Sequence, residues 1–234
     1  MHDIIERQKR KNRLQTIGLT AALFAILFAV GRNILGAGAL MLAGAGIALS
    51  LIFFSRSAGP PTGAKALSYS EAPALYEIVR RLTKRAGLAR MPVLYYLPTR
   101  VMNAAAAGDA DNPMLFVTDG ILRRLDGREL EGVLAHEISH IRNRDLALFR
   151  FAEVLRNLTG AIAQFGLILL FFALPILLTG GASFAGVLLL IAAPSLSLLL
   201  QLAIMRTREF GADIGAAELT GDPIALASAL RKLE

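Results

Sequence analysis

The chain has 234 residues, of which 55% are hydrophobic, and its mean hydropathy is positive at +0.54. This apolar content is well above that of soluble globular proteins and indicates a membrane protein. The net charge is +7, but no basic run is interleaved with aromatic residues, so we expect no nucleic-acid partner. The chain contains no cysteine, which excludes disulfides and thiolate metal ligands.

Four apolar runs predict four transmembrane helices, because each is close to the roughly 20 residues that cross the hydrocarbon core of a bilayer. The runs cover residues 14–30, 34–54, 158–178 and 182–204. Of the 25 Lys and Arg residues, only Arg32 lies in a connector that we place outside. By the positive-inside rule, both termini and the long central segment therefore face the cytoplasm.

These spans divide the chain into four parts. A basic segment and a first transmembrane hairpin occupy residues 1–56, and a second hairpin occupies residues 158–204. A cytoplasmic α+β domain fills residues 57–157 between them, and residues 205–234 form a cytoplasmic helical segment. The predicted fold is an α-helical integral membrane protein with four transmembrane helices and a small cytoplasmic β-sheet.

The central domain is predicted to begin with a helix at residues 70–86, which Ser70 can cap and Gly87 can end. Three short apolar runs bounded by Pro or Gly then predict the strands of the sheet. They cover residues 91–98, 101–107 and 114–118.

A second helix of this domain starts with a capping-box pattern, Asp126 followed three residues later by Glu129. We expect this helix to run through to about residue 156, and a further amphipathic helix to cover residues 224–234. The second helix carries the chain's clearest chemical motif.

That motif is an H-E-x-x-H pentad, residues 136–140, and it contains two of the three histidines of the chain. Residues four apart lie on one face of a helix, so His136 and His140 can bind one metal ion with Glu137 beside it. The alternative is a solvated helix face on which two histidines happen to fall. Charged residues follow at once, so the pentad lies at the cytoplasmic surface, which disfavours an intramembrane site-two-type protease.

A catalytic zinc usually has three protein ligands, and the third must here be a carboxylate. The candidates on the cytoplasmic side are Asp145, Glu153, Glu209, Asp213 and Glu218. We place Asp145 and Glu153 on the helix of the pentad itself, where neither can close the site. The second hairpin returns the chain to the cytoplasm near residue 205, which brings Glu209 and Asp213 to the side of the pentad.

The pentad with its surroundings, residues 133–140 and 143–145, and the downstream segment 206–213 resemble the HtpX-type membrane zinc metalloproteases. The resemblance covers most of the chain. It implies a gluzincin-type protease domain, one zinc ion per chain, Glu209 as the third zinc ligand, and Asp213 as a group that orients a ligating imidazole. It also implies a bacterial inner (plasma) membrane protein that cleaves damaged or misfolded membrane proteins.

A further stretch resembles the edge strand along which the substrate of this family lies. It comprises Asn103, Ala104, Ala105, Ala106 and Ala107. The family typically has an aromatic residue and a hydroxyl here, and this chain has alanines, which predicts an altered substrate pocket. The alternative is ordinary packing of small residues in a sheet.

The sequence therefore predicts a zinc endopeptidase at the cytoplasmic face of a bilayer, with polypeptide substrates and with Glu137 as the general base. Arg206 or Arg208 would stabilise the oxyanion or anchor the topology, and we favour the anchor. The rival function is a membrane scaffold with a structural zinc, which a fourth ligand from Asp213 would indicate.

Overall fold

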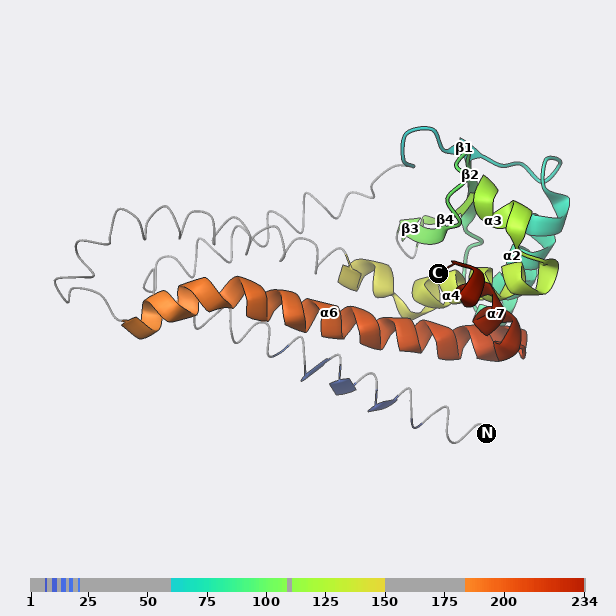
Figure 1. Cartoon of the computed structure of the whole chain (residues 1–234). Helices are drawn as coiled ribbons and strands as arrows, with labels where there is room; N and C mark the ends of the chain where they lie inside the picture. Colours follow the sequence, from blue (N-terminus) through green and yellow to red (C-terminus); the bar gives the residue numbers. More distant parts are fainter. Residues whose placement is uncertain are drawn as a thin grey trace. The chain divides into compact units, whose positions relative to one another are not determined.

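The structure is a computed structural model that describes residues 60–108, 111–149 and 184–233, together with residues 7, 10, 11, 14, 15, 17, 18 and 21 (Figure 1). The predicted spans at residues 14–30, 34–54 and 158–178 lie almost wholly outside this part of the chain. Among the residues described, no helix combines the length and the apolar character that crossing a membrane requires. The four spans thus stay a prediction.

The chain divides into two compact units. The first comprises Met1–Lys9, Ser57–Leu148 and Arg208–Glu234, and the second comprises Arg10–Arg56 and Phe149–Thr207. The first unit holds the sheet, the pentad and both downstream carboxylates, so the candidate site belongs to a single compact body.

The first unit contains a four-stranded sheet in the order β1-β2-β4-β3. Its strands are β1 (Lys65–Ala66), β2 (Val93–Leu97), β3 (Ala104–Gly108) and β4 (Pro113–Thr118). Strand β4 pairs parallel with β2 and antiparallel with β3, and every residue of β4 is buried. The apolar run that predicted β4 thus forms a central strand, and β3 is left at an edge.

Two details of the sheet differ from the sequence prediction. The short strand β1 was not predicted, because two residues carry no alternating pattern. The strand predicted at residues 101–107 begins at Ala104 instead, because residues 98–103 connect the end of β2 to β3. The predicted substrate strand is therefore β3 preceded by Asn103.

Helix α2 (Pro73–Ala86) packs beside α4 and contributes an apolar stripe to the core. Leu75, Val79 and Leu82 recur at helical spacing and are all buried in the core. The helix ends at Gly87, whose φ of 68° suits a glycine, as predicted. It begins at Pro73 and not at Ser70, because the hydroxyl of Ser70 lies 3.0 Å from that of Ser68 and caps nothing.

Helix α3 (Asp119–Arg124) leads into α4 (Gly127–Asn143), which carries the pentad. The predicted capping box is confirmed, because the Asp126 carboxylate accepts from the N–H of Glu129 while the Glu129 carboxylate accepts from the N–H of Asp126. The expected continuation of α4 to residue 156 is interrupted: α4 ends at Asn143, residues 145–149 are helical again after Arg144, and residues 150–156 lie outside the described part of the chain. Arg144 takes a left-handed conformation, with φ at 59°, and its N–H closes the helix onto Ile141.

Helix α6 (Phe184–Thr220) is one continuous helix, and α7 (Pro223–Leu233) follows it. Figure 1 shows α2 and α7 beside α4. Helix α7 is held against α4 by Glu129, which accepts hydrogen bonds from Ser228 at 2.8 Å and from Lys232 at 2.6 Å. Helix α4 is therefore fixed by neighbours along its length, so its histidines have fixed positions.

Candidate metal centre

The two histidines of the pentad face the same point from α4. Their Nε2 atoms lie 3.2 Å apart, and the His136 and His140 side chains are 13% and 6% exposed. Ile138, on the opposite face of α4, is fully buried in the core. The helix thus turns its apolar face to the sheet and both imidazoles to one side.

Glu209 completes the group from α6. Its Oε2 lies 3.2 Å from Nε2 of His136, and its Oε1 lies 3.8 Å from Nε2 of His140. Ligand atoms that bind zinc tetrahedrally at roughly 2.0–2.2 Å are about 3.3–3.6 Å apart. Within the described part of the chain, His136, His140 and Glu209 form a group that could hold a metal ion, with one ligand atom from each residue within 4.8 Å of the others.

The other nitrogen of each imidazole is bound to a carboxylate. Nδ1 of His136 lies 2.9 Å from Asp213, and Nδ1 of His140 lies 3.0 Å from Asp145. A carboxylate that accepts a hydrogen bond from Nδ1–H keeps the ring proton on Nδ1 and leaves the Nε2 lone pair directed at a metal ion. Asp213 thus lies behind the His136 imidazole, and its role in orienting a zinc ligand stays a prediction.

The catalytic candidate Glu137 is held by the edge of the sheet. Its Oε2 accepts a hydrogen bond from the N–H of Ala106 at 2.8 Å. That N–H points away from β4, so the free edge of β3 runs past the carboxylate of Glu137. The pentad and the predicted substrate strand therefore meet at one place.

The sequence of the chain was compared with those of known protein families. The profile of Peptidase family M48 matches residues 69–234. The chain belongs to this family. It is therefore a metalloprotease, a hydrolase that acts on peptide bonds.

Curated relatives point to the HtpX type within Peptidase family M48. The chain is 42% identical to the Protease HtpX homolog of Paenarthrobacter aurescens, an alignment covering 92% of this chain and 77% of the relative. It is 40% identical to the homolog of Nostoc punctiforme, with 95% and 80% covered, and 38% identical to that of Sulfurihydrogenibium sp., with 95% and 78% covered. No solved structure is significantly similar to the chain.

The M48 site favours positive charge. Burial alone would lower the pKa of His136, but the carboxylates of Asp213 and Glu209 outweigh it and raise that pKa above its ordinary value. Burial acts likewise on His140, and Asp145 and Glu209 raise its pKa. The two imidazoles in turn lower the pKa of Glu209 to about 2. Three carboxylates around two imidazoles suit a cation.

Glu137 behaves differently from the other carboxylates of this M48 site. Burial raises its pKa, and the nearby imidazoles only partly oppose this effect. A carboxylate with a raised pKa holds a proton more readily near neutral pH, which is the property that a general base needs.

Two residues of the M48 site were missed by the sequence reasoning. Asp145 is 1% exposed, and its second oxygen accepts a hydrogen bond from Arg208 at 3.0 Å. The sequence predicts Asp145 on the helix of the pentad and favours Arg208 as a topology anchor. In the structure, the left-handed turn at Arg144 folds Asp145 back onto His140. Arg208 forms an ion pair with Asp145. The signal available in the sequence was the pair of opposite charges, Asp145 shortly after the pentad and Arg208 directly before Glu209.

The predicted substrate strand of this M48 peptidase divides into two parts. Asn103 exchanges two hydrogen bonds with the Thr118 side chain and accepts one from its N–H, so Asn103 fixes the start of the strand. The four alanines form β3 and pair with β4 in register. Only small side chains therefore line the edge beside Glu137.

Proposed function

We propose that this M48 peptidase is a zinc endopeptidase in which His136, His140 and Glu209 bind one zinc ion. The observation that carries the proposal is the convergence of the three side chains: the two Nε2 atoms are 3.2 Å apart, and one ligand atom from each of the three residues lies within 4.8 Å of the others. The carboxylates on both Nδ1 atoms support it further, since they fix the tautomer that zinc binding requires.

Glu137 acts as the general base in this proposal. It takes a proton from the attacking water and passes it to the nitrogen of the leaving peptide. The N–H of Ala106 orients its carboxylate, and burial raises its pKa toward the working range. When bound, zinc supplies a Lewis acid that polarises the scissile carbonyl and acidifies a water molecule.

A catalytic zinc keeps one coordination position open, whereas a structural zinc is closed by four protein ligands. Asp213 lies on Nδ1 of His136, behind the ring, and so does not compete for the ion. Glu209 is 51% exposed, which leaves the ion side of the site in contact with solvent. Both observations favour catalysis over a structural scaffold.

The substrate strand is proposed to be β3. Within the described residues no strand pairs with its outer edge, where the N–H of Ala106 donates to Glu137, and a substrate in extended form can add to this edge through backbone hydrogen bonds. Because the strand is lined by alanines, recognition there depends on the substrate backbone more than on its side chains.

We propose that the peptidase is anchored in a bacterial inner membrane with its site facing the cytoplasm, and that damaged or misfolded membrane proteins are its substrates. The apolar runs and the distribution of Lys and Arg support this location. The cysteine-free chain allows a direct test. A membrane-impermeant thiol reagent added to intact cells should label Asn33→Cys and not Ser57→Cys. Labelling of Ser57→Cys alone would reverse the orientation.

Zinc content tests the ligand assignment. Purified parent protein should bind one zinc ion per chain, and Glu209→Ala should lose most of it. Asp222→Ala is a matched control, because Asp222 pairs with Arg128 at an exposed site outside the group. Equal zinc content in all three proteins would exclude Glu209 as a ligand.

A further inference from the structure

A second polar site lies where β2 and β4 end, apart from the histidines. It is a cavity of about 390 Å³ lined by Arg100, Asp119, Gly120, Arg123 and Arg124. Gly120 is buried against the connection to β3, and a Cβ there would clash with the carbonyl oxygens of Arg100 and Val101. The absence of a side chain thus lets this connection rest directly on α3 and sets the depth of the cavity.

The cavity carries an excess of positive charge. Arg123 donates to Asp119 at 2.6 Å, and Tyr96 donates to the other oxygen of Asp119 at 3.0 Å. The Asp119 carboxylate is therefore already satisfied, and its pKa is lowered chiefly by Arg123. Three arginines against one aspartate leave two positive charges unbalanced.

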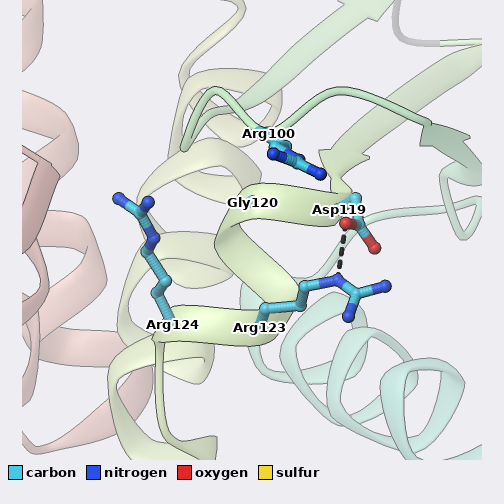
Figure 2. Close-up of a pocket in the computed structure, with 5 residues that line it drawn as sticks. All are labelled: Arg100, Asp119, Gly120, Arg123 and Arg124. Atoms are coloured by element: carbon cyan, nitrogen blue, oxygen red, sulfur yellow. Dashed lines mark hydrogen bonds and ion pairs between the residues drawn. The ribbon is translucent and has the colours of Figure 1, made fainter.

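The two remaining guanidinium groups are available to a ligand. Figure 2 shows Arg100 and Arg124 on either side of Gly120, with Arg100 directed toward Asp119. Within the described part of the chain, Arg100 donates no hydrogen bond, and Arg124 has only a weak contact with the Met102 sulfur at 3.6 Å. Arginine presents a planar fork of donors that fits a carboxylate.

The connection that enters the substrate strand also lines the cavity. Arg100 belongs to the connection that leads through Asn103 into β3, and Ala106 of β3 contacts Glu137. Ala106 to Asn103 spans about 10 Å at roughly 3.3 Å per residue. A substrate on the free edge of β3 would thus reach the cavity about four to six residues from the bond that is cleaved.

We propose that this arginine cavity binds a carboxylate of the substrate polypeptide, either an acidic side chain or the C-terminal carboxylate, at a distance from the scissile bond. The site would select among extended polypeptides that the alanine-lined strand itself cannot distinguish. This inference rests on the proposed endopeptidase function with β3 as the substrate strand.

The test compares kcat/KM for flexible peptides that share one cleavage site. One series carries Glu at successive positions on either side of that site with an amidated C-terminus, and a matched series carries Gln. A third arm has Gln and a free C-terminus. The parent should prefer Glu, or the free C-terminus, by roughly fivefold at one position or two adjacent ones, and salt should reduce this preference.

Substitutions then locate the preference. Arg100→Gln and Arg124→Gln should each bring the ratio of the charged to the neutral peptide close to one, and Arg100→Lys should keep part of it. Arg231→Ala, at an exposed site on α7, should leave the ratio as in the parent. Because each ratio is internal to one protein, a variant that folds poorly does not change it.

Three outcomes would overturn the proposal. The parent could cleave charged and neutral peptides equally at every position, or both Gln variants could keep the parental ratio. Alternatively, vesicles containing anionic lipid could activate the parent through Arg100 without any peptide preference, which would assign the cavity to the membrane surface. In contrast, failure of the zinc-loaded parent to cleave any peptide would reject the endopeptidase function itself.

Discussion

Asp145 and Arg208 join the two halves of the metal centre. The buried carboxylate of Asp145, just after α4, accepts from Arg208 on α6 at 3.0 Å, and its other oxygen lies 3.0 Å from Nδ1 of His140. Arg208 directly precedes Glu209 in the sequence. One ion pair thus orients an imidazole on α4 and fixes the turn of α6 that carries the third candidate ligand.

Removal of Arg208 should therefore weaken metal binding without touching a ligand. Arg208→Ala leaves a buried carboxylate with one partner lost, and we expect zinc affinity to fall about 10–100-fold. Chelator competition measures this affinity, with Arg231→Ala as the control. An unchanged affinity in Arg208→Ala would show that the ion pair does not position the site.

The packing of α6 on α4 is also set by Gly215. A Cβ there would lie 2.5 Å from the Ser139 hydroxyl and 2.8 Å from Arg142, so Gly215→Ala must push the helices apart. We expect a loss of about 1–3 kcal/mol in the free energy of unfolding, with weaker zinc binding. Gly211→Ala on the same helix meets nothing within 4 Å and should be neutral or stabilising. Thermal unfolding followed by circular dichroism compares the two variants.

Metal binding should release a proton. The neighbouring carboxylates raise the pKa of His136 to about 10 and that of His140 to about 9, and the two Nε2 atoms are 3.2 Å apart, close enough to share a proton. One proton therefore lies between the rings at neutral pH, and zinc must displace it. Calorimetric titration in buffers with different ionisation enthalpies should give release of about one proton at pH 7. No release would mean that both Nε2 atoms are already unprotonated.

The attachment of α7 should depend on pH through Glu129. The hydrogen bond from Lys232, with those from Asp126 N–H and Ser228, lowers the pKa of Glu129 from 4.5 to about 2. The folded protein binds this proton less readily than the unfolded chain, so the stabilisation is complete above pH about 4.5 and is lost as the pH falls toward 2. Metal-free parent should lose thermal stability over this range more steeply than Glu129→Gln. If thermal stability fell equally with pH in the two proteins, titration of Glu129 would not contribute to the stability of the α7 attachment.

Much of the site was predictable because its residues carry strong local signals. The pentad, the capping box at Asp126 and the apolar run of β4 each follow from spacing along the chain. The sequence also led to Glu209 and Asp213, since a missing thiolate and a remote histidine left only carboxylates. The roles of Asp145 and Arg208 were not predictable, because they depend on the left-handed turn at Arg144. That turn carries no glycine, the residue that usually marks a left-handed conformation. Tertiary contacts, and not local preference, place them.

The general-base role of Glu137 is the central claim, and one comparison tests it most directly. Parent and Glu137→Gln are both loaded with zinc, and cleavage of a flexible reporter polypeptide is measured alongside zinc content. Glu137→Gln keeps the size of the side chain and removes its basicity, so we predict one zinc ion per chain in both proteins and a rate at least about 100-fold lower in the variant. Cleavage by zinc-loaded Glu137→Gln at the rate of the parent would contradict the account.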